Sequence, residues 1–201
     1  MADPRELPIV GGNLALDFAN TVDDPLGPAR HDHLTTYDDL LVWSVRTGVL
    51  PAGDLDRRRR SVAQQSRAAS AALRRAHGLR DALNGVFGAV ATGVTLPSDD
   101  WVTLRRVAAD GLGHAVVRPS GTGYRLDWPW EELLAPLWPV ADAAVTLLRS
   151  GDRRRVKRCA GCPWLFLDVS RSGTRRWCSM EDCGTHEKVK RYVAKRAAAR
   201  R

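Results

Sequence analysis

Several features that would assign a protein to a familiar class are missing from this 201-residue sequence. No apolar run approaches the ~18 residues that a membrane-spanning helix needs. The opening MADPRELPIV lacks the basic and apolar segments of a signal peptide. Nucleophile-elbow, P-loop and dinucleotide-binding fingerprints are also absent. We therefore expect a cytoplasmic protein that does not contact membranes and is not an enzyme.

Cysteine is absent from the first 150 residues, and so is any basic excess. These residues hold 16 Lys or Arg and 18 Asp or Glu, a balance of −2. Residues 151–201 hold 15 and 5, a balance of +10, together with all four cysteines: Cys159, Cys162, Cys178 and Cys183. The composition predicts two domains, residues 1–150 and residues 151–201.

The first domain is predicted to be mainly helical with one small β-hairpin, an α+β arrangement. Helical spacing of apolar residues occurs in three segments: 35–48, 55–91 and 130–151. Thr36 is the expected N-cap of the first, and Gly78 is the point where the second is strained or broken. In the third, the regular helix is expected to begin near Pro139. Residues 114–128 read as a hairpin because β-branched and aromatic residues flank PSGTG.

The cysteines are spaced as Cys-x2-Cys, fifteen residues, then Cys-x4-Cys. Clustered cysteines in a chain without an export signal are more often metal ligands than disulfides. The pattern predicts one structural zinc ion in a closed site of four thiolates, the alternative being four free cysteines in a small core. His186 could replace a ligand, but four thiolates already fill a tetrahedron, so we expect it at the surface.

The residues around the cysteines predict a treble-clef or zinc-ribbon-like finger. WLFLDV (164–169) and TRRWCS (174–179) are expected to pair as strands across the turn SRSG, with a helix after Gly184. The apolar residues Val189 and Val193, with Tyr192 between them, are expected to pack that helix against the hairpin.

The helix after Gly184 is strongly basic. Lys188, Arg191 and Lys195 recur at i, i+3 and i+7, and cations at this density match the spacing of phosphates. The residues expected to contact nucleic acid are Arg171, Arg175, Arg176, Lys188, Lys190, Arg191, Lys195 and Arg196. The alternatives are a solvated helix, or a zinc-stabilised module that binds RNA or a protein. A single finger reaches few bases, so specific DNA binding is expected to need a homodimer or a second contact surface.

Two stretches resemble known families. RCAGCPWLFLDVSRSGTRRWCSMEDCGTHEKVKRY resembles the CGNR-type zinc finger of bacterial proteins, except that Thr185 and His186 stand where the family has Asn and Arg. NLALDFANTV (13–22) and YDDLLVWSVRTGVL resemble the ABATE domain that usually precedes this finger. The resemblance implies a stress-related transcription regulator, which would bind DNA in the cytoplasm at the nucleoid.

Three polar residues, Asp17, Asn20 and Thr21, interrupt the apolar segment 11–22. One interpretation is that they cap or pin a first helix through nearby backbone groups. The other is that they orient a small-molecule effector in a pocket lined by some of the seven tryptophans. The sequence leaves both open, and periodicity does not show whether the segment is helix or strand.

Overall fold

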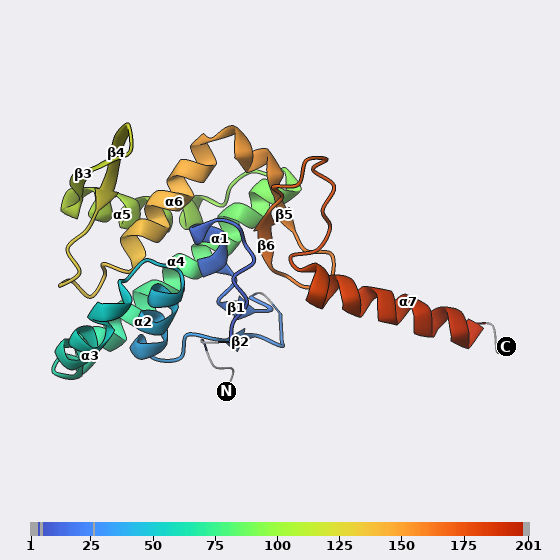
Figure 1. The fold of residues 1–201 in the computed structure, drawn as a ribbon, viewed down its shortest axis with the longest axis horizontal. Helices are drawn as coiled ribbons and strands as arrows, with labels where there is room; N and C mark the ends of the chain where they lie inside the picture. Colours follow the sequence, from blue (N-terminus) through green and yellow to red (C-terminus); the bar gives the residue numbers. More distant parts are fainter. Residues whose placement is uncertain (1–3, 5, 26, 199–201) are drawn as a thin grey trace.

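The computed structural model describes residues 4, 6–25 and 27–198, which fold mainly into helices (Figure 1). The helices are α1 (Leu14–Ala19), α2 (Tyr37–Arg46), α3 (Leu55–Ala63), α4 (Ser66–Thr92), α5 (Ser98–His114), α6 (Leu137–Arg149) and α7 (Thr185–Ala198). Short 3-10 turns cover Ala52–Asp54 and Gly151–Arg155, and a π-helical turn covers Met180–Gly184. No helix within these described residues is long and apolar enough to cross a membrane.

The strands form three separate antiparallel pairs. They are β1 (Val22–Asp23) with β2 (His31–Asp32), β3 (Val116–Ser120) with β4 (Gly123–Asp127), and β5 (Val156–Arg158) with β6 (Leu165–Leu167). The pair β3–β4 is the hairpin predicted at residues 114–128. The mainly helical class with small hairpins is confirmed.

Helix α2 begins as its sequence predicts. The Thr36 hydroxyl accepts a hydrogen bond from the Asp39 amide at 3.1 Å, and the Asp39 carboxylate accepts one from the Thr36 amide at 2.7 Å. This reciprocal capping box satisfies amides that have no partner inside the helix.

The break between the helices of residues 55–91 differs from the prediction, whereas the third predicted helix begins near Pro139 as expected. The break in residues 55–91 falls at Gln65, whose φ of −128° and ψ of 37° separate α3 from α4, while Gly78 lies inside α4. Burial of the α4 face outweighs the weak helix propensity of one glycine. Helix α6 begins at Leu137, so Pro139 occupies its first turn, where an amide has no intrahelical acceptor to lose.

Helix α4 is the centre of the fold and crosses the middle of the body in Figure 1. It packs against α1, α2, α5 and α6, and its apolar face is fully buried from Ala76 to Phe87. Trp43 of α2 and Trp138 of α6 are among the largest buried side chains of this core. Burial of such a face, rather than intrinsic propensity, accounts for most of a helix's stability.

The zinc-finger segment shares this core. Strand β5 packs on α4 and β6 packs on α1, and Val156 and Leu165 belong to the same buried cluster as the helices. The predicted pairing of 164–169 with 174–179 is wrong: β6 pairs instead with β5, and residues 174–177 form no strand. The reason is that the Cys159–Cys162 knuckle itself makes the turn between β5 and β6.

Asn20 joins the two parts of the chain by mimicking a strand. Its side-chain amide donates to the Leu165 carbonyl at 2.8 Å and accepts from the Leu165 amide at 2.8 Å. Nearby, the Leu167 amide donates to the Gly11 carbonyl at 2.7 Å. The N-terminal segment therefore pairs with the open edge of β6. The amides of Leu165 and Leu167 and the Leu165 carbonyl all have hydrogen-bond partners there.

We predict that Asn20→Ala destabilises the protein by about 2–3 kcal/mol, because it leaves a buried amide and a buried carbonyl of Leu165 without partners. Asn13→Ala, which removes only the N-cap of α1, should cost about 1 kcal/mol. Urea unfolding of both variants measures the two costs. Equal losses would show that the Asn20 contact contributes no more than an ordinary cap.

Candidate metal centre and basic surface

The four cysteines converge at one point. Their Sγ atoms all lie within 4.8 Å of one another, with Cys162 to Cys178 at 3.6 Å and Cys178 to Cys183 at 3.7 Å. Zn–S bonds of about 2.3 Å in a tetrahedron place sulfur atoms about 3.8 Å apart. The donor set and its spacing fit one structural zinc ion, as the sequence predicts. His186 lies outside the cluster and is exposed, also as expected.

Backbone amides and close packing fix the thiolates. The amides of Gly161 and Cys178 donate to the Sγ of Cys159 at 3.4 and 3.3 Å. Gly161 leaves room for Cys183, since a Cβ on Gly161 would lie 3.3 Å from the Cβ of Cys183. The π-helical turn then carries Cys183 into the first turn region of α7. The metal centre therefore determines where α7 starts.

The four thiols do not ionise independently of one another. A hydrogen bond from Cys178 lowers the pKa of Cys162 to about 6, whereas burial raises the pKa of Cys183 to about 12. The contact with Cys162, followed by burial, raises the pKa of Cys178. One thiolate therefore suppresses ionisation of its neighbours. Zinc supplies the charge that keeps all four deprotonated.

Asp168 organises the loop between β6 and Cys178. Its side chain is fully buried and accepts from Lys157 Nζ at 2.6 Å, from the Ser170 hydroxyl at 2.6 Å and from the amides of Ser170 and Arg175 at 3.0 Å. Hydrogen bonds from Lys157 and Ser170 hold the pKa of Asp168 well below its usual range. Asp168 therefore fixes the loop that follows β6 and carries the chain to Cys178.

Arg175 belongs to the same loop structure. Its guanidinium donates to the Trp177 carbonyl at 2.7 Å and to the Cys178 carbonyl, and it lies 4.7 Å from the Phe166 ring centre. These contacts engage two of its nitrogens within the finger. Arg175 therefore supports the zinc loop, and its expected contact with nucleic acid stays a prediction.

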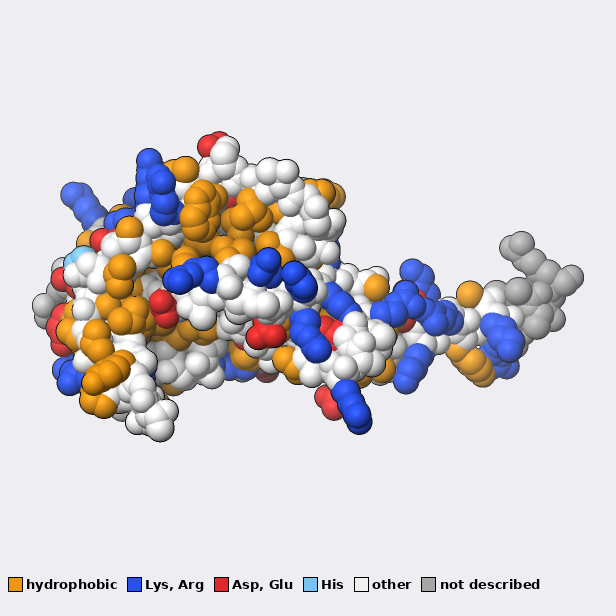
Figure 2. Space-filling model, turned by 90° about the horizontal axis from the view of Figure 1, so that it is seen from above, with side chains coloured by type: hydrophobic (Ala, Val, Ile, Leu, Met, Phe, Trp, Pro, Cys, Tyr) orange, Lys and Arg blue, Asp and Glu red, His pale blue; other side chains and the backbone are white. Residues whose placement is uncertain are grey.

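The other expected contact residues form one exposed set, here called the basic surface: Arg171, Arg176, Lys188, Lys190, Arg191, Lys195 and Arg196. Five of them lie on α7, which projects from the body in Figure 1 and carries a concentration of cations in Figure 2. Within the described residues, their acidic neighbours are few: Glu187 lies 3.6 Å from Arg191 and 4.0 Å from Lys190.

The apolar side of α7 does not pack against the hairpin. Val189, Tyr192 and Val193 remain 54–59% exposed, so that expectation is wrong. The physical reason is the position of Cys183: it starts the helix at the outer end of the finger and directs it away from β5 and β6.

The three polar residues of the opening segment are buried and hydrogen-bonded within the protein. Asp17 accepts from the Gly11 amide at 2.7 Å, and the Thr21 hydroxyl donates to the Phe18 carbonyl at 2.8 Å. Together with the Asn20 contacts to β6, these bonds account for all three side chains without a ligand. Burial raises the pKa of Asp17 to about 6, against the opposing effect of backbone hydrogen bonds.

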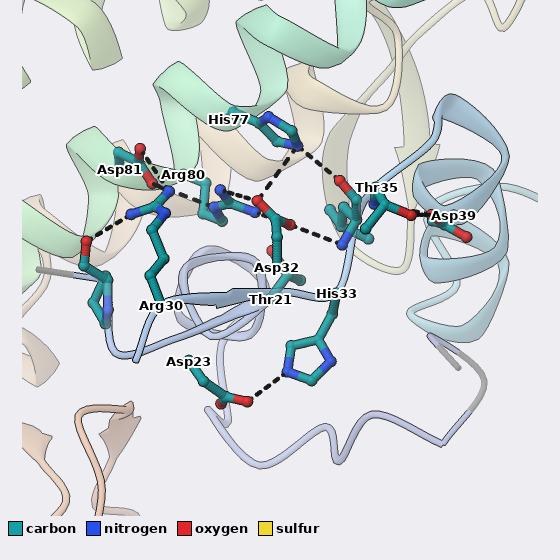
Figure 3. A network of polar contacts seen from close by, with 12 residues as sticks. Thr21, Asp23, Arg30, Asp32, His33, Thr35, Asp39, His77, Arg80 and Asp81 are labelled. Atoms are coloured by element: carbon teal, nitrogen blue, oxygen red, sulfur yellow. Dashed lines mark hydrogen bonds and ion pairs between the residues drawn. The ribbon is translucent and has the colours of Figure 1, made fainter. Parts of the chain in front are cut away.

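Within the His-Asp-His stretch at residues 31–33, Asp32 and His33 belong to a polar network around the β1–β2 loop and α4 (Figure 3), whereas the exposed His31 ring packs edge-on against His33. Arg80, fully buried, donates to both oxygens of Asp32 at 2.7 Å, and His33 Nε2 lies 2.9 Å from Asp23. Although burial opposes it, Arg80 lowers the pKa of Asp32. The network explains these residues as structural anchors.

A core of packed helices that is joined through a shared strand to a four-cysteine finger defines a zinc-finger protein with an N-terminal helical domain. Residues 12–151 match the ABATE family, described as "Putative stress-induced transcription regulator", and residues 155–196 match the CGNR zinc finger. The chain belongs to the ABATE family and carries a CGNR finger. No curated protein matches it.

We predict that Cys178→Ser releases zinc. The outer finger, meaning the Cys159–Cys162 knuckle and the chain from Asp168 to Gly184, should then unfold, while β6 stays docked on the helical core. Apparent binding energies of structural zinc are on the order of 10 kcal/mol, so the outer finger depends on the metal. The amides of Leu165 and Leu167 should stay protected from hydrogen exchange because Asn20 and Gly11 bind them. The amides of Ala160 and Gly184 should exchange fast.

Chelation of zinc from the wild-type protein is the control and should give the same exchange pattern. Fast exchange at Leu165 would show that β6 depends on the metal rather than on the helical core.

We predict that Asp17→Asn changes the pH dependence of stability. Because the folded pKa is about 6 and the unfolded pKa about 3.9, the Asp17 contribution is full below pH 4 and is lost as pH rises to 6. The amide keeps an acceptor for Gly11 but does not ionise. The stability of the variant relative to wild type should therefore rise by about 2–3 kcal/mol between pH 4 and pH 7. A difference that stays constant across this range would contradict the burial of an ionising Asp17.

Proposed function

We propose that this protein regulates transcription by binding duplex DNA through the basic surface. The observation that carries the proposal is that α7 leaves the body with its cations exposed while its first turn is fixed by the metal centre. A cationic surface of this kind gains binding free energy by releasing counterions from phosphates. The regulator family to which the chain belongs supports the same reading.

The shape of α7 suits a groove of DNA. Its 14 residues span roughly 21 Å, and the major groove of B-DNA, about 12 Å wide, admits one α-helix. A helix of this length is marginal alone. Contact with DNA would stabilise it, and the exposed Val189, Tyr192 and Val193 would then face bases or a second copy of the chain. A homodimer would supply the additional base contacts that a single finger lacks.

The proposal assigns a binding role and not a catalytic one. Asp32 is bound on both oxygens by Arg80, and His33 is paired with Asp23, so the residues closest to an acid–base set are engaged in structural contacts. The four thiolates leave no open position on a zinc ion, as a structural site requires. We place the protein in the cytoplasm at the nucleoid, where its DNA would be.

We expect the affinity for duplex DNA to fall with salt, at a slope of log affinity against log salt near −4 to −5 for about five phosphate contacts. Replacing Lys188, Arg191 and Lys195 together by Ala should make that slope shallower by roughly 2.7, because each contact contributes about 0.9. Fluorescence anisotropy over a salt series measures the slope, and zinc content shows that the finger remains folded.

The matched control replaces Arg60, Arg67 and Arg74 by Ala, three exposed arginines of α3 and α4 at the far end of the body. It removes the same charge and should leave the slope unchanged. If both triple variants change the salt slope equally, DNA responds to the net charge of the protein and not to the basic surface. If the zinc-loaded protein binds RNA but not duplex DNA, or neither, the interaction-module alternative replaces this proposal.

A further inference from the structure

A hollow of about 420 Å³ opens between α5, α6 and the end of β4, far from the basic surface. Its walls are mainly apolar: Trp101, Leu126, Trp128, Trp138 and Val145. Figure 2 shows hydrophobic side chains gathered on the face over α6, with Lys and Arg side chains beside them. Volumes of about 300–1,000 Å³ with apolar walls and few polar groups are typical of small-molecule sites.

Hydrogen bonds to α5 fix the positions of two of the tryptophans, Trp128 and Trp138. Trp128 donates its indole N–H to the Gly111 carbonyl at 2.8 Å, and Trp138 donates its own to Asp110 at 2.9 Å. Gly111 is essential to this arrangement, because a Cβ there would lie 2.9 Å from the Cβ of Trp138. Both N–H groups are already used and the Trp138 ring is stacked on His114 at 4.5 Å, so these two buried rings form the floor of the hollow, while the less buried Trp101 and Leu126 complete an apolar wall that suits a flat ring.

The small side chains of α5 keep the hollow open. Ala108 and Ala109 lie on the α5 face that lines it, where longer side chains would fill the space. Gly111 lies against Trp138, and Trp101 lines a second hollow together with Leu148, so α5 and α6 run antiparallel. Trp138 therefore lies toward one end of the α5–α6 pair and Trp101 toward the other.

Three charged side chains line the hollow: Arg105, Asp142 and Arg149. Within the described residues, none of the three makes a hydrogen bond or an ion pair. Because α5 and α6 are antiparallel, Arg105 of α5 lies opposite the α6 segment between Asp142 and Arg149. With two arginines against one aspartate, the hollow is net cationic.

We propose that this hollow binds a flat, apolar small molecule carrying a carboxylate, with the ring against the tryptophans and the carboxylate on Arg105 and Arg149. Arginine binds a carboxylate through paired, charge-assisted hydrogen bonds, and the apolar floor removes the ring from water. The site includes neither Asp17, which accepts from the Gly11 amide, nor Asn20, which pairs with β6. The inference does not depend on DNA binding.

The test titrates the full-length, zinc-loaded protein with 2-naphthoate by calorimetry, with neutral 2-naphthamide and cationic 2-naphthylmethylamine as probes of the same ring. We expect saturable one-to-one binding of 2-naphthoate, with the other two at least about tenfold weaker, since one charge-assisted contact is worth that much. Equal affinity for the neutral probe, preference for the cation or no saturable binding of 2-naphthoate would overturn the proposal.

Variants separate the site from general effects. Arg105→Gln with Arg149→Gln should weaken 2-naphthoate at least about tenfold and leave 2-naphthamide unchanged. Arg106→Gln removes an exposed charge beside Arg105, outside the hollow, and should change neither. Ala109→Trp, at an exposed lining position, should abolish binding of both ligands by filling the space while melting as wild type does. Unchanged 2-naphthoate binding in the double variant or in Ala109→Trp would place the ligand elsewhere and refute the site.

Discussion

The docking of the zinc finger on the helical core depends on one side-chain amide that forms strand-like hydrogen bonds. Asn20 pairs with both backbone groups of Leu165, 145 positions away in the sequence, and thereby fixes β6 against the helical core. Because β6 also continues through Asp168 into the zinc loop, this contact orients the metal centre relative to the body. The finger is therefore not a module on a flexible linker. Its inner hairpin is part of the domain that precedes it.

The outer finger has a different source of stability. Around the cysteines few apolar side chains are buried: Phe166 of β6, together with Cys159 and Cys178, forms a cluster of its own. Such a segment does not offset the entropy of ordering its loops by burial alone. Zinc on four thiolates and the buried carboxylate of Asp168 supply fixed points instead. Zinc would hold the four cysteines together, and the Asp168 carboxylate fixes the loop between β6 and Cys178 through the amides of Ser170 and Arg175.

The sequence predicted local features well and long-range contacts poorly. Thr36 and Asp39 predict a helix N-terminus because the capping residues lie within four positions of each other. The spacing of the cysteines likewise predicts the metal centre, because all four lie within one short stretch of the chain. The break at Gln65 was missed because packing on α4 overrides the propensity of Gly78. Asn20 could be recognised as unusual within an apolar segment, but its partner in β6 could not, since nothing local links the two. The direction of α7 likewise follows from where Cys183 joins the cluster in space.

The arrangement separates the charges of the chain along its length. The first 150 residues are close to neutral, at −2, whereas α7 alone carries five Lys or Arg against one acidic residue, Glu187. A polyanion would therefore be attracted to one end of the molecule, at a distance set by the Debye length of about 8 Å at physiological salt. If α7 binds DNA as proposed, the connection from α1 through Asn20, β6 and the four-cysteine cluster would set the angle between that helix and the body. A flexible basic tail would bind phosphates equally well but would not present a helix to a groove at a defined angle.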